Sequence, residues 1–313
     1  MSITIHAYRG EDDLPRLLDL INAMPLACRH VIDLPWRVSS PAICEGRDAA
    51  YWQDDEGQVV GFAAWQYYWA ALDFFIRPGL PDPTRESVEA ALFAWAEQRF
   101  RERDAKRGSP LPYAVEYRDD DLERRRLVEA HGFTLDDDED GYVGFEHPLR
   151  DLAPVPALPA GFALRPLDGE REAAAYAELH RAAFQSDSMT TEWRARTIRA
   201  PQHRADLDLV IAANDGSLAA FCVGWYAPTR RVAQIEPMGV HPRYTRLGLG
   251  RVLLLELLRR FRAVGAESAI VQTNLGRAPA RAAYQSVGFQ EAHRIRRLKK
   301  WADTASTMPA ETP

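Results

Sequence analysis

Cysteine is scarce in this chain. Three residues, Cys28, Cys44 and Cys222, occur among 313, and no two of them form a Cys-x-x-Cys pair. A fold built on disulfides and a cysteine-based zinc site are therefore not expected, and the pattern favours a reducing compartment. We expect no metal site.

Long apolar runs and an excess of positive charge are missing as well. The first residues, MSITIHAYRGEDDL, lack the basic-then-apolar pattern of a secretion signal, and no apolar run approaches the length that spans a bilayer. The net charge of −6 argues against a general binder of nucleic acids or anionic membranes. We expect a cytoplasmic protein, monomeric or homodimeric, without nucleic-acid or membrane partners.

What the chain does contain is an internal repeat. A proline-rich window, PLRDLAPVPALPAG, divides the sequence almost in half and fits an extended linker. Trp65 and Trp225 each end an apolar run in their half. The separation in sequence of Gly132 and Gly288 is nearly the same as that of the two tryptophans, as a repeat requires. The pattern predicts domains over residues 1–149 and 161–302, a linker over 150–160 and a disordered tail over 303–313.

Each half alternates short strands with helices. Strands such as ITIHAY and FALRPL precede helices, and a strand pair around the tryptophan precedes a long helix. This alternation predicts an α/β (α+β) fold with a mixed sheet covered by helices.

The segment from Ile235 to Phe261 carries the clearest functional signal. It reads as a strand, a loop holding Gly248 and Gly250, and a leucine-rich amphipathic helix. The start of such a helix presents unpaired backbone N–H groups and a positive dipole end, which suit phosphates. Leu253 stands where a dinucleotide-binding loop needs a small residue, and no Walker pattern occurs. The alternative is a tight turn without a ligand.

The motifs around this loop have a known counterpart. Val240-His241-Pro242, the two glycines, a strand, Pro279-Ala280, Tyr284 and Gly288-Phe289 follow one another in an order that resembles the GNAT superfamily of acyl-CoA-dependent N-acyltransferases. The resemblance covers residues 161–301. It implies tandem GNAT-like domains, each a mixed, mostly antiparallel twisted sheet flanked by helices. It also implies acetyl-CoA as co-substrate and transfer of an acetyl group to the primary amine of a small molecule.

The resemblance also implies the residues that bind the cofactor. The turn that wraps the pyrophosphate of coenzyme A with main-chain N–H groups corresponds to Arg246, Leu247, Gly248, Leu249, Gly250 and Arg251. The strand that pairs with the pantetheine arm corresponds to Met238, Gly239 and Val240. Asn274 and Arg277 are further candidates for cofactor contacts. Thr245 departs from the family, which usually has Arg or Gln there.

Two residues are candidates for acid–base chemistry. Glu236 lies on the strand beside the expected thioester and could remove a proton from the ammonium form of the acceptor. It could equally bind a cationic substrate or form a structural ion pair. Tyr284 stands where the family often places a general acid that protonates the leaving thiolate. The alternative is a tyrosine that only packs its ring.

The first half lacks these features. At its corresponding helix the chain reads GLPDPTRESVEAALFAWAEQRF, without a Gly-x-Gly. Its prolines remove amide donors, and Asp82 and Glu86 would repel a pyrophosphate. Leu127 or Val128 stands at the position of Tyr284. We therefore expect a degenerate, non-catalytic first domain.

Two other function classes stay open from the sequence. A non-catalytic sensor would bind acyl-CoA without turnover, and a nucleotide-binding regulator would bind ATP or NAD in competition with coenzyme A. Several polar residues are interpreted as structural: His180 and His203, the turn residues Asp206 and Asp208, and the acidic run 136–140 as a solvated hairpin turn.

Overall fold

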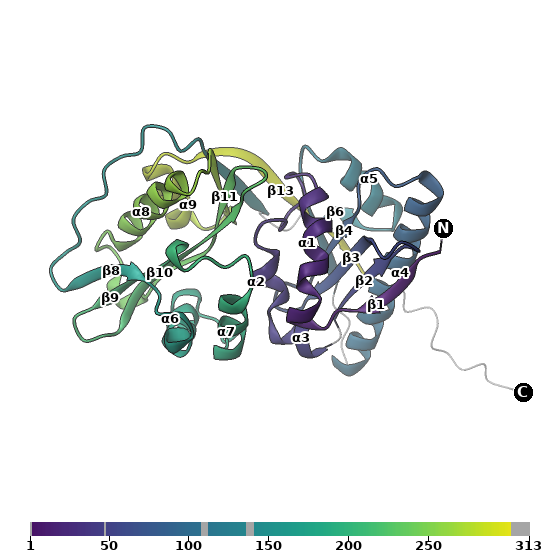
Figure 1. Ribbon diagram of the computed structural model, residues 1–313, viewed down its shortest axis with the longest axis horizontal. Helices are drawn as coiled ribbons and strands as arrows, with labels where there is room; N and C mark the ends of the chain where they lie inside the picture. The colour runs from purple at the N-terminus through teal and green to yellow at the C-terminus, as the bar shows by residue number, and fades with distance from the viewer. Residues whose placement is uncertain (1, 47, 108–111, 136–140, 302–313) are drawn as a thin grey trace, which may run out of the picture.

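The computed structural model describes residues 2–46, 48–107, 112–135 and 141–301 (Figure 1). The acidic run at 136–140 and the tail at 303–313 lie outside these residues. The first half contains β1 (Thr4–Ala7), α1 (Leu14–Ala23), α2 (Leu34–Val38), α3 (Pro41–Gly46), β2 (Ala49–Gln53), β3 (Val59–Gln66), β4 (Ala71–Ile76), α4 (Asp82–Arg107), β5 (Tyr113–Arg118), α5 (Leu122–Ala130), β6 (Thr134–Leu135) and β7 (Tyr142–His147).

The second half repeats this order of elements. It contains β8 (Phe162–Pro166), α6 (Ala173–Phe184), α7 (Thr191–Arg199), β9 (Asp208–Ala213), β10 (Leu218–Ala227), β11 (Val232–Val240), α8 (Leu249–Ala263), β12 (Ser268–Asn274), α9 (Ala278–Ser286) and β13 (Gln290–Lys300). Short 3₁₀ helices occur at Gly10–Asp12, Tyr67–Trp69, Gly169–Glu172, Ala205–Leu207 and Pro242–Tyr244. The shared order agrees with the repeat inferred from the sequence.

One sheet runs through both halves. Within the described residues it has 13 strands in the order β1-β2-β3-β4-β5-β13-β7-β12-β11-β10-β9-β8, with β6 beside β13. Only β4–β5 and β11–β12 pair in parallel there. The mixed, mostly antiparallel sheet expected from the sequence is confirmed, although the strands of the two halves join into a single sheet.

The two halves exchange their last strands. β7, from the first half, pairs with β12 of the second, and β13, from the second half, pairs with β5 of the first. Val143 and Phe145 of β7 are buried in the second core, and Leu298 of β13 is buried in the first. Figure 1 shows β13 crossing from one half to the other. Each half therefore depends on the other to complete its sheet and its core.

The proline-rich segment follows β7 and leads to β8 without regular secondary structure between them. It runs along the outside of the second half (Figure 1). Leu152, Val155 and Leu158 on this segment pack against the second core. Its prolines suit such an extended course because they cannot continue a helix.

Helices cover the faces of the sheet as their apolar faces require. In α8, the leucines at 253, 254, 257 and 258 are all buried, while Arg259 and Arg262 face outward. None of the helices that the structure describes is long and apolar enough to cross a membrane.

One expectation about the second half is wrong. Asp208 is not a turn residue: it begins β9, is fully buried, and pairs with Arg194 and with His203 at 2.8 Å. No local pattern indicates this pairing, because Arg194 comes from α7. His203 thus forms a hydrogen bond with a buried carboxyl group, in agreement with a structural role.

Candidate functional site

The strands β11 and β12 separate in the middle of the second half. They pair in parallel only from Val232–Ser268 to Ile235–Val271, after which β12 continues along β7 and β11 continues along β10. The register between β10 and β11 shifts where Glu236 and Pro237 stand on β11. Such a bulge redirects a side chain and often lies beside an active site. The edge of β11 beyond Ile235 is therefore left unpaired by β12.

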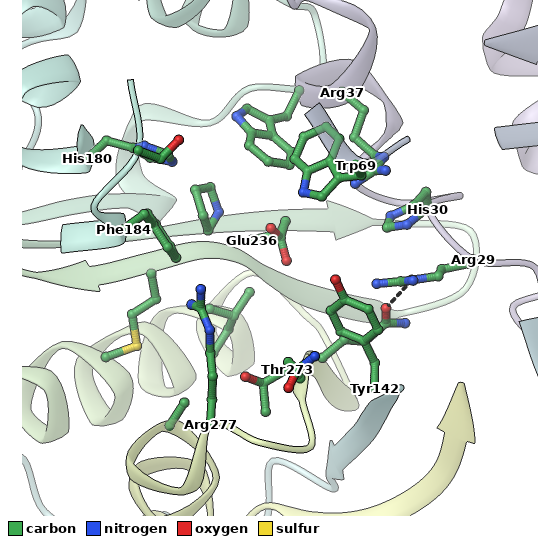
Figure 2. Close-up of a pocket in the computed structure, with 18 of the residues that line it drawn as sticks. Arg29, His30, Arg37, Trp69, Tyr142, His180, Phe184, Glu236, Thr273 and Arg277 are labelled. Carbon is green, nitrogen blue, oxygen red and sulfur yellow. Dashed lines mark hydrogen bonds between the residues drawn. The ribbon is translucent and has the colours of Figure 1, made fainter. Parts of the chain in front are cut away.

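A cavity of about 390 Å³ begins at this separation and reaches the first half (Figure 2). Its second-half wall includes His180, Phe184, Ser186, Ser188, Trp193, Ile235, Glu236, Pro237, Met238, Gln272, Thr273, Asn274, Arg277, Ala280 and Tyr284. Its first-half wall is formed by Arg29, His30, Trp36, Arg37, Trp69, Glu116 and Tyr142. The structure thus brings Glu236 and Tyr284 into one cavity, with both halves around them.

Glu236 lies in the middle of this cavity, between Phe184 on one side and His30 on the other (Figure 2). Its backbone carbonyl accepts a hydrogen bond from Trp225 Nε1 at 2.6 Å, which anchors the strand there. Burial raises the pKa of its carboxyl group to about 8, and the charge of Asp33 adds to this rise, while Arg37, Arg29 and Arg277 oppose it. A carboxylate with this pKa can exchange a proton with an amine near neutral pH.

Tyr284 is held on α9 with its ring nearly buried. The ring packs against Phe145 and Phe289, each with 5.9 Å between ring centroids. Burial raises the pKa of the phenol, so the hydroxyl stays protonated at neutral pH. Tyr284 therefore packs its ring and lines the cavity at once, and its role as a general acid stays a prediction.

The predicted phosphate loop precedes α8. Gly248 has φ +78°, a conformation that other residues adopt only with strain, and the first backbone bond of α8 runs from Val252 N–H to its carbonyl at 3.2 Å. The N–H groups of Leu249, Gly250 and Arg251 consequently have no partner within the helix. A β-carbon on Gly250 would lie 3.1 Å from Met238 Cε. The loop therefore offers donors at a place where the helix lies close to β11.

The other predicted cofactor residues surround this loop and the strand edge. Gly239 and Val240 are half-buried on β11, and Leu249 is buried while Arg246 and Leu247 are exposed. Arg251 donates a hydrogen bond to Ser286 O, and Thr245 Oγ1 donates to Pro242 O at 3.1 Å. Both predicted loop arginines are exposed, and Arg251 is tied to the end of α9 by its bond to Ser286.

Asn274 and Arg277 lie at the cavity next to Tyr284. Asn274 Oδ1 accepts a hydrogen bond from Gly276 N–H at 2.8 Å and so shapes the loop before α9. The Arg277 guanidinium lies 5.5 Å from the centroid of the Phe184 ring (Figure 2). Both side chains line the cavity, so contact with a bound cofactor stays a prediction for each.

None of the residues of the first-half wall was named in the sequence analysis. Arg29 Nε donates to Gln272 Oε1 at 2.8 Å and Arg29 also pairs with Glu116, while Arg37 pairs with Asp73 at 2.9 Å. These residues lie in no recognisable motif, and their strands and loops come together only through the shared sheet. His180, interpreted as structural, also lines the cavity.

Comparisons with known proteins agree with this geometry. Residues 173–289 match the acetyltransferase (GNAT) family. The chain is 38% identical over 115 residues to a mycothiol acetyltransferase of Kineococcus radiotolerans, covering 36% of this chain and 37% of the relative. It is 30% identical over 147 residues to that of Thermomonospora curvata, covering 45% and 49%. The chain thus matches about half or less of the length of these relatives.

Solved structures match over almost the whole chain. A tandem GNAT protein from the clavulanic acid biosynthesis pathway superposes with a TM-score of 0.64 at 18% identity, covering 96% of this chain and 99% of the other. A GCN5-related N-acetyltransferase from Sphaerobacter thermophilus gives 0.57 at 18% identity, covering 96% of each. At this identity the likeness shows the fold alone. Residues 173–289 in the second half thus match the acetyltransferase (GNAT) family, and the chain as a whole has the fold of the tandem GNAT structures.

Proposed function

We propose that this protein transfers an acetyl group from acetyl-CoA to the primary amine of a small molecule. The observation that supports this best is the position of Glu236 where β11 leaves β12, inside a cavity that Tyr284 also lines. Met238 connects the cavity to the predicted phosphate loop, because it lines the cavity and lies against Gly250.

The residues present fit coenzyme A. The free N–H groups at the start of α8 suit a pyrophosphate, and the unpaired edge of β11 at Met238–Val240 suits the amides of a pantetheine arm. A thioester bound in this way supplies a carbonyl carbon that an amine can attack. The GNAT family uses acyl-CoA, which makes acetyl-CoA the first donor to test.

Glu236 and Tyr284 would carry the protons of this reaction. Glu236, as the carboxylate, accepts a proton from the ammonium form of the acceptor, which frees the lone pair on nitrogen. As the new C–N bond forms, the C–S bond breaks and its electron pair goes to sulfur. Tyr284 donates its proton to that sulfur, and the second proton of the nitrogen leaves to solvent. Both side chains are then restored by proton exchange with water.

The first half would bind the acceptor, because its side chains form the wall that faces Glu236. This role is compatible with a first half that has no cofactor site of its own. The absence of nucleic-acid and membrane partners, a monomeric or homodimeric state, and a cytoplasmic location stay predictions.

The test is release of free thiol from acetyl-CoA in the presence of a panel of amines, including the acceptor of mycothiol acetyltransferases. We expect thiol release that depends on an amine and falls in Glu236→Gln. Binding of acetyl-CoA without turnover on any amine would instead identify a sensor. Competition of ATP or NAD with coenzyme A would point to a nucleotide-binding regulator.

A further inference from the structure

His30 and Asp33 form a buried pair at the first-half end of the cavity. They lie on the segment between α1 and α2, and both side chains are at most 5% exposed. His30 Nδ1 lies 3.1 and 3.3 Å from the two carboxylate oxygens of Asp33. His30 lines the cavity, and Figure 2 shows its ring on the side away from Phe184.

The protonation state of this pair follows from its surroundings. Burial, together with the charge of Arg37, lowers the pKa of His30 to about 4, so the ring is neutral at pH 7. Burial alone would raise the pKa of Asp33, but the contact with His30 and the charge of Arg37 outweigh it and bring this pKa to about 2. An ionised carboxylate can only accept hydrogen bonds, so Nδ1 carries the proton and Nε2 has a free lone pair.

That lone pair has no partner in the part of the chain that the structure describes. His30 Nε2 is buried without a hydrogen bond, and so is Trp36 Nε1, six residues further along the same segment. Buried polar groups are almost always hydrogen-bonded, so two unpartnered groups on one cavity wall point to a ligand that satisfies them. One of them accepts a hydrogen bond and the other donates one.

The charged side chains of this wall are already paired within the protein. Arg29 pairs with Glu116 and lies 4.4 Å from the centroid of the Tyr142 ring. Arg37 pairs with Asp73 and lies 4.4 Å from the centroid of the Trp69 ring. A ligand group here therefore meets charges that are already paired, the lone pair of His30 Nε2 and the N–H group of Trp36. These suit a neutral polar group better than a carboxylate.

We propose that His30, oriented by Asp33, determines acceptor specificity by accepting a hydrogen bond from a neutral hydroxyl or amide group that the acceptor carries in addition to its reacting amine. The two groups are distinct because Glu236, where the amine reacts, and His30 lie apart on the cavity wall (Figure 2). This inference rests on the proposed function. It assigns the substrate class as amines with a second, uncharged hydrogen-bond donor.

Three amines of equal chain length probe this role: 5-amino-1-pentanol, pentylamine and 5-aminopentanoate. With the full-length protein and acetyl-CoA, we expect kcat/KM to be about tenfold higher for the aminoalcohol than for pentylamine, and lowest for the carboxylate. In His30→Phe the ratio of kcat/KM between the aminoalcohol and pentylamine should fall to about one, through a higher KM for the aminoalcohol. His30→Gln places an acceptor oxygen near the former Nε2 and should restore part of the preference.

Acetyl-CoA affinity and circular dichroism of both variants serve as controls for folding. A merely structural role would lower the rates on all three amines together and leave their ratio unchanged, which would overturn the inference while leaving acetyl transfer intact. Equal rates of the wild type on the aminoalcohol and pentylamine would overturn it as well. Absence of thiol release with every amine would contradict the proposed function itself.

Discussion

The two halves of the molecule share a fold but differ at the place where their parallel strands separate. In the second half, β11 and β12 enclose a cavity beyond their last pair. In the first half, β4 and β5 pair in parallel only at Ala71 and Ala114. There the Arg124 guanidinium bridges the two strands: it donates to Phe74 O at 3.2 Å and to Glu116 O at 3.3 Å.

The Arg124 side chain fills the space between β4 and β5 in the first half. Its guanidinium lies 3.9 Å from the centroid of the Phe74 ring. It is the third residue of α5, and the third residue of the matching helix α9 is Ala280, which lines the cavity. One helix thus closes the gap between the strands with a long side chain, and the other leaves it open with a short one.

The starts of the two long helices differ in the same sense. At α4 the N–H group of Thr84 bonds to Pro81 O at 2.9 Å, and Pro83 has no N–H group to offer. At α8 the first N–H groups have no partner within the helix. The shared fold therefore does not by itself explain the proposed acyl-CoA site. We infer that small residues and free amides at these two places distinguish the second half from the first.

We expect the largest effect at Tyr284, the proposed general acid. Val128 stands at the matching position of the first half and cannot donate a proton. Tyr284→Phe keeps the packed ring and removes the proton, so turnover should fall by roughly 10²-fold. Steady-state kinetics would show this, with acetyl-CoA affinity almost unchanged. Turnover like that of the wild type would mean that another group protonates the leaving sulfur.

An arginine at position 280, which matches Arg124 of the first half, should fill the cavity of the second half. Ala280→Arg would place a guanidinium between β11 and β12, and acetyl-CoA affinity should fall by at least tenfold, about 1.4 kcal/mol. Calorimetry measures this, and Ala280→Ser is the matched small control that should bind normally. Undiminished binding in the arginine variant would remove the cavity from the cofactor path.

The loops before the two long helices, α4 and α8, provide a matched pair of substitutions. Gly248 and Gly79 have nearly the same φ, +78° and +77°, and at both positions a β-carbon would meet no atom within 4 Å. Gly248→Glu should weaken acetyl-CoA binding about tenfold through charge repulsion, whereas Gly79→Glu carries the same backbone strain and should not. Equal affinities of the two variants would show that the loop before α8 does not hold a pyrophosphate.

The smallest effect concerns stability against pH. The pKa of Glu236 is about 8 in the folded protein and about 4.5 as its ordinary value, so the folded state binds more protons between these pH values. Stability therefore falls as pH rises through this window. Glu236→Gln should raise Tm by roughly 2–4 °C at pH 9 and leave it unchanged at pH 4. An equal shift at both pH values would mean that the carboxyl is not perturbed.

Local patterns predicted much of this structure. The proline-rich segment, the apolar face at Leu253 and Leu257, and the glycines before α8 each act over a few residues, so the sequence shows them directly. The predicted cofactor and catalytic residues line the strand edge, the helix start and the cavity, and their roles stay predictions.

The sequence does not show which strands pair when they lie far apart along the chain. β7 and β13 have ordinary strand composition, and nothing in it shows which sheet they join. Arg124 looks like any exposed arginine of α5 until β4 and β5 separate beside it. His30 and Asp33 resemble a polar loop, and only the fold around them buries the pair.

We infer that the second half binds acetyl-CoA and the first half does not. Calorimetric titration of the full chain tests it most directly, since the exchanged strands make separated halves unsuitable. We expect one acetyl-CoA per wild-type chain and one per Gly79→Glu chain with the same affinity, and an affinity about tenfold lower in Gly248→Glu. Two molecules per wild-type chain, or wild-type affinity in Gly248→Glu, would contradict this.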